Sequence, residues 1–279
     1  MVCLSMCSVV VFTNCQRNQL NRDTSTSEDN NTAQSLWDDV GDQVDGTYSL
    51  EESDSLPAWN NCATIRIDTL GSPFPILFTI DFGEVNCECV DGRLRRGSII
   101  YESSGPFRLA GTVVTVTTDD YYVNDYRVEG SRITTNRGNN AQGFPHFSIA
   151  VIEGMITTPD DEMISWESNR VRTWIEGSET GFFTPDTING GFLGWEGILD
   201  DVFEISGTAN GTSIDGRTFS AEITDPLRAQ LDCKWITKGT IALIPDELLT
   251  RTINYGDGNC DKNATVSIGS KTYDITLRD

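Results

Sequence analysis

The sequence predicts an antiparallel all-β fold of about fourteen strands, arranged as a meander or a sandwich with an internal repeat. From Cys62 onward, segments that alternate β-branched or aromatic residues with polar ones follow one another, as in CATIRIDT, GTVVTVTTDDYYV and KTYDITL. Asn-Gly, Asp-Gly and Gly-Ser pairs lie between these segments, where hairpin turns are expected. No long window beyond Cys62 has a convincing helical pattern, so strands are expected to form the folded part.

The balance of charge limits the classes of partner. The 279 residues include 42 acids and 20 bases, which gives a formal net charge of −22. Binding to phosphates requires clustered Lys and Arg. We therefore expect no nucleic acid partner and no attraction to an anionic membrane surface.

Residues 1–14 are predicted to be a lipoprotein signal peptide. An uncharged apolar run extends from Val2 to Phe12, too short for a membrane span of roughly 20 residues but typical of a signal-peptide core. The sequence FTNC that ends at Cys15 resembles a relaxed lipobox of Bacteroidota. That resemblance implies that Cys15 is the lipidated first residue of the mature chain, held at the outer membrane and facing the periplasm or the cell surface.

Residues 15–58 are predicted to be an acidic flexible tether. Nine acids and no base lie between Ser27 and Asp54. Such a composition buries too little apolar surface to fold alone, so we expect at most a short helical turn at SLWDDV. The folded all-β domain is then expected to span residues 59–279.

Two segments of that domain, about 62–101 and 233–278, share one design and form the predicted repeat. In each, a cysteine opens a strand, and a later strand ends in IDFG or INYG shortly before a second cysteine. Export and this spacing predict two local disulfides, each contributing about 2–4 kcal/mol. A pair Cys87–Cys260 that joins the two copies is the competing arrangement. The predicted local pairs are Cys62–Cys87, with Cys89 as a substitute partner, and Cys233–Cys260.

Several sequence segments of the domain also support a family resemblance. Five segments of the chain resemble a widespread family of uncharacterised Bacteroidota lipoproteins. They are FTIDFG, DGRLRRGSIIYESSGPFRLAGTVVTVTTDDYYVNDYRVEGSRITTN, DDVFEISGTANGT, CKWITKGTI and RTINYGDGNCDKNATVSIGSKTYDITLR. The resemblance covers about residues 62–278. It implies an acidic tether on a lipid anchor followed by one β-rich domain, and it implies no activity.

Two motifs that suggest chemistry are better explained as turns. Asp81-Phe82-Gly83 matches a kinase magnesium loop, but the only histidine, His146, does not belong to an HRD motif, and the second copy replaces the aspartate by Asn254. The loop GDGNCDK has calcium-like spacing without the glycine and glutamate of an EF-hand, so it is only a weak calcium candidate. We expect no metal and no cofactor. The weak calcium ligands are Asp257, Asn259 and Asp261.

The segment ISWESNRVRTWIEG suggests a ligand-binding face. If it forms a strand, one face presents Trp166, Arg170, Arg172 and Trp174, a platform for a sugar or an anionic chain if exposed. Alternatively, the tryptophans pack inside and the arginines pair with acids on neighbouring strands. We therefore expect a non-enzymatic interaction or structural module of the cell envelope, with an envelope protein or a glycan as partner. The alternative is a surface glycan-binding protein or a hydrolase that acts on glycans.

Overall fold

The computed structural model describes residues 24–45, 62–67, 74–181, 184–188, 190–191, 193 and 196–277. The predicted signal peptide and the lipid anchor at Cys15 lie outside these residues. The described chain contains two helices, α2 (Ser25–Asp45) and the short α4 (Glu196–Leu199), and strands that belong to a single sheet. Neither helix is long and apolar enough to cross a bilayer.

The all-β prediction is confirmed, and the sheet is a meander rather than a sandwich. Fourteen antiparallel strands follow one another in chain order, except that β3 pairs with β4 off the main path. The strands are β1 (Thr64–Ile67), β2 (Ile76–Asp81), β3 (Cys87–Glu88), β4 (Leu94–Ser103), β5 (Val113–Val123), β6 (Tyr126–Asn139), β7 (Pro145–Thr157), β8 (Met163–Glu176), β9 (Val202–Thr212), β10 (Thr218–Gln230), β11 (Cys233–Pro245), β12 (Arg251–Asp257), β13 (Asn263–Ile268) and β14 (Lys271–Thr276).

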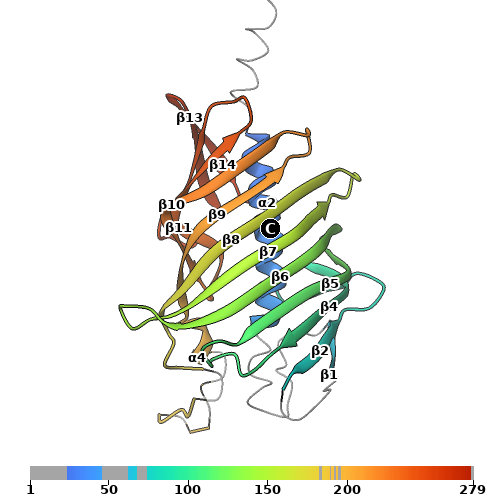
Figure 1. The fold of residues 1–279 in the computed structure, drawn as a ribbon, viewed down its shortest axis with the longest axis vertical. Coiled ribbons are helices and arrows are strands. Elements are labelled where there is room, and N and C mark those ends of the chain that lie inside the picture. The colour runs from blue at the N-terminus through green and yellow to red at the C-terminus, as the bar shows by residue number, and fades with distance from the viewer. Residues whose placement is uncertain are drawn as a thin grey trace, which may run out of the picture.

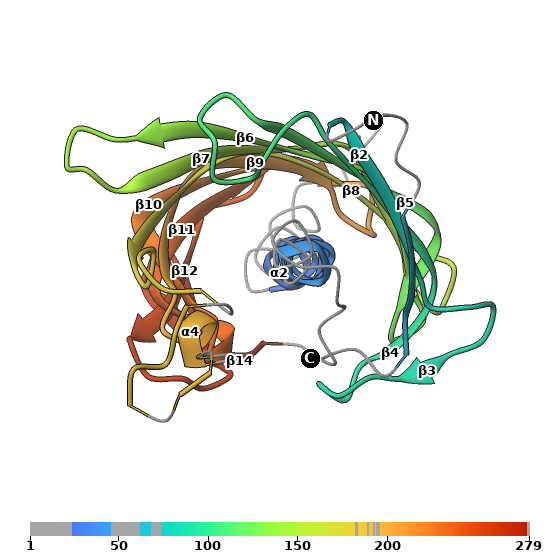
Figure 2. The same ribbon diagram turned by 90° about the horizontal axis from the view of Figure 1, so that it is seen from below.

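The sheet curves around α2 without closing. Figure 1 shows the long strands β5 to β10 crossing in front of the helix, and Figure 2, seen nearly along the helix axis, shows the sheet wrapped around it. In the described part of the chain, β1 and β14 form the two ends of the strand order and do not pair with each other. The concave face of the sheet is therefore the face that meets α2.

Glycines at shifts of strand register allow this curvature. Gly97 interrupts the pairing of β4 with β5 at a φ of 81°, and Gly130 interrupts the pairing of β6 with β7 at 130°. A Cβ at Gly97 would lie 1.9 Å from the carbonyl oxygen of Asp120, so no other residue fits there. Bulges of this kind bend a strand and increase its twist.

The helix α2 corrects the prediction of a flexible tether over residues 15–58. Residues 25–45 form a helix of 21 residues enclosed by the sheet, far more than the helical turn expected at SLWDDV. The rest of the predicted tether lies outside the described residues. An apolar stripe at helical spacing packs against the sheet and belongs to the common core: Ala33, Leu36, Trp37, Val40 and Val44.

Both predicted disulfides are present. Cys62 is bonded to Cys87, and Cys233 to Cys260, with Cα–Cα distances of 5.7 and 5.8 Å. The competing pair between the two copies is excluded. Cys89 is a buried free thiol, so it does not substitute for either partner of the first bridge.

The repeated IDFG and INYG phrases have the same structural role in both copies. The side chain of Asp81 accepts a hydrogen bond of 2.8 Å from the backbone NH of Gly83, and Asn254 accepts one of 2.8 Å from Gly256. An aspartate or an asparagine makes this turn equally well. The intervening aromatics, Phe82 and Tyr255, are both buried, which explains why the motif retains its shape and not its carboxylate.

Candidate functional site

A cavity of about 580 Å³ lies between α2 and the concave face of the sheet. Small-molecule sites in proteins typically measure roughly 300–1,000 Å³. Its walls come from α2, from β6 to β12 and from the segment around α4. The apolar part of this lining includes Trp37, Phe107, Ile149, Val151, Trp166, Trp174, Ile198, Phe203 and Ile205.

The strand face predicted to bind a ligand lines this cavity instead of the outer surface. Trp166, Arg170, Arg172 and Trp174 lie on β8 with their side chains on the concave side, and their exposed fractions are 2%, 8%, 8% and 7%. The exposed platform for a glycan is therefore wrong. It follows that any ligand of these residues must enter the space between the helix and the sheet.

The tryptophans pack inside, as the alternative prediction proposed, but Arg170 bonds to α2 and not to an acid of a neighbouring strand. The indole NH of Trp166 donates a hydrogen bond of 3.1 Å to Asn30, and Arg170 donates one of 3.0 Å to Gln34. Trp174 is the exception, because its indole NH donates to Asp201 just before β9, at 3.1 Å. Guanidinium groups lie over both indole rings, Arg170 over Trp166 at 5.1 Å and Arg108 over Trp174 at 4.9 Å from the ring centre.

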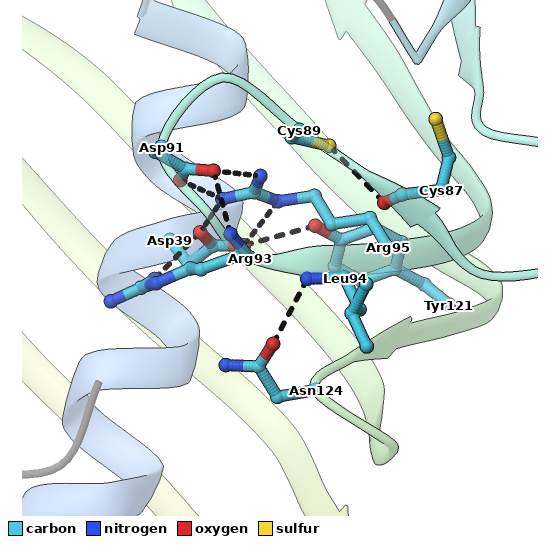
Figure 3. A network of polar contacts seen from close by, with 9 residues as sticks. All are labelled: Asp39, Cys87, Cys89, Asp91, Arg93, Leu94, Arg95, Tyr121 and Asn124. Atoms are coloured by element: carbon cyan, nitrogen blue, oxygen red, sulfur yellow. Dashed lines mark hydrogen bonds and ion pairs between the residues drawn. The ribbon is translucent and has the colours of Figure 1, made fainter.

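A buried ion-pair network anchors the other side of α2 (Figure 3). The Asp39 carboxylate accepts hydrogen bonds from Arg93, at 2.7 Å, from Arg95, and from the hydroxyl of Tyr121, at 2.9 Å. Asp91 forms a second ion pair with Arg95, at 2.6 Å. Because two carboxylates meet two guanidinium groups here, the network is balanced in charge and holds the helix in register with β4 and β5.

A second cluster of charges faces the cavity around Asp38. Burial raises the pKa of the Asp38 carboxyl above its ordinary value, although Arg170, Arg132 and Arg172 act in the opposite direction. Burial likewise lowers the pKa of the Arg170 guanidinium, which nevertheless remains a cation at neutral pH. Here three guanidinium groups act electrostatically on one carboxyl of the helix.

Asp201 contributes a further carboxyl to the cavity wall. Burial raises its pKa to about 7, against the lowering effect of the hydrogen bond from Trp174 and of Arg108 and Arg172. Neighbouring Asp200 raises it further. The Asp201 carboxyl therefore changes charge near neutral pH.

The weak calcium candidates and His146 do not line the cavity. In the second repeat, Asn259 donates a hydrogen bond of 2.8 Å to Asp257, and Asp261 accepts one of 2.8 Å from the backbone of Asn263, as in ordinary polar turns. Among the described residues, no group of three or more His, Cys, Asp or Glu side chains is placed to hold a metal ion. A ring nitrogen of His146 lies 2.9 Å from the carbonyl oxygen of Gly138, outside the cavity lining.

The residues that sequence reasoning missed are those of α2 and the arginine that faces it from β6, Arg132. The apolar spacing of Ala33, Leu36, Trp37 and Val40 was a usable signal for the helix, but the surrounding acids obscured it. Comparisons with protein-family models, with curated proteins and with solved structures found no match to this chain.

Proposed function

We propose that the chain is a non-enzymatic binding module of the cell envelope and that it holds a small, largely apolar molecule between α2 and the sheet. One observation carries the proposal: a cavity of about 580 Å³ lies between the helix and the sheet and is lined by indole, phenyl and aliphatic side chains together with a few charged ones. Mostly apolar walls with a small number of placed polar groups are typical of ligand sites.

The placement of the charged residues also favours binding. Asp39, Asp91, Arg93 and Arg95 are used to hold the helix, and Cys233 of the lining is in a disulfide. We expect the lining to recognise a molecule and release it unchanged.

A neutral fluorescent probe tests this function. The full chain carrying Cys15→Ala, which needs no detergent, is titrated with N-phenyl-1-naphthylamine, whose emission rises in apolar surroundings. We expect a saturable rise with one site per chain. The variant Ala229→Phe, which places a ring in the cavity wall, is expected to weaken binding about tenfold, because the added ring occupies the space of the probe. Absence of saturable binding to the parent chain would refute the proposal.

The matched control uses the opposite face of the sheet. Ala150 on β7 lies between Ile149 and Val151, which both line the cavity, so its own side chain points outward. Ala150→Phe should leave probe binding unchanged. Equal weakening by both substitutions would show that the effect is general and that the cavity is not the site.

We also propose that Cys15 carries a lipid that anchors the module to the outer membrane, facing the periplasm or the cell surface, as in the lipoprotein family that the sequence resembles. Metabolic labelling with a palmitate analogue should mark the natural chain and not the Cys15→Ala variant. Membrane partitioning of Cys15→Ala equal to that of the natural chain would refute the anchor. An envelope protein that delivers or receives the bound molecule remains the partner class that we propose.

A further inference from the structure

We infer that the molecule held in the cavity has a neutral head with a hydroxyl group, which donates a hydrogen bond to the Asp38 carboxyl. This inference rests on the proposed binding function and adds the chemical class of the ligand. It starts from the side of α2 that meets the cavity. Asn31, Gln34 and Asp38 are three and four residues apart, so they lie on one side of the helix, and all three belong to the lining.

The Asp38 carboxyl retains capacity to accept hydrogen bonds. The amide oxygen of Gln34 accepts a hydrogen bond from Arg170, so the amide NH2 group is the donor that reaches Asp38. One such donor fills only part of a carboxyl group, whose two oxygens offer roughly four sites for donors. Asp38 is half-buried, so part of its side chain is open to a molecule in the cavity.

Burial makes a donor from the cavity favourable at this position. It raises the pKa of the Asp38 carboxyl above its ordinary value, because water solvates the charged form poorly there. A ligand hydroxyl would replace a hydrogen bond that the carboxyl loses with its water. A carboxyl accepts such a bond whether it is ionised or protonated.

The charges around Asp38 favour a neutral head over an ion. Arg132 and Arg170 both act electrostatically on this carboxyl, and they would repel an ammonium group placed beside it. An anionic head would meet the negative charge of Asp38 itself. A hydroxyl has no net charge and both donates and accepts, so it suits a carboxyl that lies near guanidinium groups.

The apolar wall of the cavity begins beside this group. Arg170, which donates its hydrogen bond to Gln34, lies over the ring of Trp166 at 5.1 Å from the ring centre. Ile149, opposite Arg170 on the neighbouring strand β7, also lines the cavity. Walls of this kind favour an aliphatic or aromatic body. The combination selects an apolar body that ends in an alcohol.

The other carboxyls of the lining are less suited to this role. Asp39 and Asp91 form the ion pairs drawn in Figure 3. Asp201 is 5% exposed and accepts the indole NH of Trp174. At the surface, water competes for hydrogen bonds with any ligand. Two further aspartates of the lining are exposed to solvent: Asp42 and Asp232.

Displacement of the bound N-phenyl-1-naphthylamine tests the inference on the full chain carrying Cys15→Ala. The two main competitors are 1-decanol and its isomer methyl nonyl ether, which accepts hydrogen bonds and donates none. We expect the alcohol to displace the probe at a concentration about tenfold below that of the ether, since hydrogen bonds to a carboxylate are among the stronger ones.

Two ions of the same chain length test whether the head is neutral. Decylammonium and decanoate should each require a higher concentration than 1-decanol to displace the probe at neutral pH. If either ion displaces it at a lower concentration than the alcohol, the neutral head is overturned.

Variants of Asp38 assign the preference to this carboxyl. Asp38→Leu should bring the concentrations needed for the alcohol and the ether close to each other while the neutral probe still binds. Asp38→Asn keeps an uncharged acceptor, so the preference should fall to about threefold. Asp160→Asn, an exposed aspartate outside the lining, should leave the preference unchanged.

The outcomes separate this inference from the proposed function. Equal displacement by alcohol and ether on the parent chain overturns the hydroxyl head and leaves the apolar site standing. A chain that does not bind the neutral probe overturns both. If Asp38→Leu does not fold, as judged by circular dichroism, Asp38→Asn decides: a preference equal to that of the parent chain overturns the role of Asp38.

Discussion

Replacing Asp39 by asparagine tests whether α2 is an integral part of the fold. The substitution keeps the shape of the side chain and removes the negative charge that meets Arg93 and Arg95. Arg95 would then keep only Asp91, Arg93 would keep only its weaker electrostatic interactions, such as that with Asp42, and the Tyr121 hydroxyl would lose its charged acceptor. We expect the variant to be clearly less stable than the parent chain.

The magnitude follows from the burial of these groups. Asp39 and Arg95 are 2% and 1% exposed, and breaking a buried ion pair by removing one partner costs roughly 3–5 kcal/mol. Arg95 keeps its ion pair with Asp91, and the Arg93 side chain is 11% exposed, so the lower limit, about 3 kcal/mol, is expected. For a domain of this size, that corresponds to a decrease in Tm of about 6–12 °C.

Urea unfolding of the full chain, followed by tryptophan fluorescence, measures this effect. Trp37 of α2 is 1% exposed, so its emission reports release of the helix together with unfolding of the sheet. The matched control is Asp160→Asn, the same substitution at an exposed position of the turn between β7 and β8, with an expected change within about 0.5 kcal/mol. If the two variants are equally stable, the helix does not depend on the ion-pair network and the reasoning is refuted.

Three further predictions concern other parts of the molecule. Replacing Cys233 and Cys260 together by serine should lower the free energy of unfolding by about 2–4 kcal/mol, and an unchanged urea midpoint would contradict this. The pKa of the Asp201 carboxyl is raised to about 7 in the folded chain, so this carboxyl stabilises the fold at pH values below the ordinary pKa range of an aspartate, and the stabilisation is lost as the pH rises through 7. Asp201→Asn should flatten this decline in the free energy of unfolding. Parallel pH profiles of the two chains would contradict the prediction. Gly97→Ala should destabilise the chain more than Gly111→Ala, because both glycines have a positive φ but only a Cβ at Gly97 would meet backbone atoms; thermal unfolding of the two variants compares them.

The strands and the disulfides could be predicted because their signals are local. Alternation of side chains along each strand and the turn residues between strands depend on neighbours in sequence, and the meander pairs each strand with the next. The two copies of the cysteine unit close loops within themselves for the same reason. A meander is thus the sheet topology that sequence patterns describe best.

The curvature of the sheet and the position of the ligand face could not be predicted in this way. Alternation shows that Trp166, Arg170 and Trp174 share one face of β8, but not which face is concave or what covers it. The answer depends on contacts such as the one between Trp166 and Asn30, which are 136 residues apart. Pairing with a neighbouring strand was the ordinary expectation for Arg170, and it was wrong because its hydrogen-bond partner, Gln34, lies on a helix far away in sequence.

The acidic N-terminal segment and the arginines of the strands form the two sides of one interface. This explains why the predictions made for each segment from its own sequence were wrong. In isolation, the acids of residues 25–45 favour disorder because they repel one another and leave backbone polar groups to water. Against the concave face, Asp39 forms ion pairs with Arg93 and Arg95, while the arginines of β6 and β8 act electrostatically on Asp38. The helix is stable where the sheet supplies the opposite charge and an apolar surface for Trp37 and Val40. The same complementarity of charge and apolar surface that holds the helix therefore also positions the side chains of α2 that line the cavity beside it.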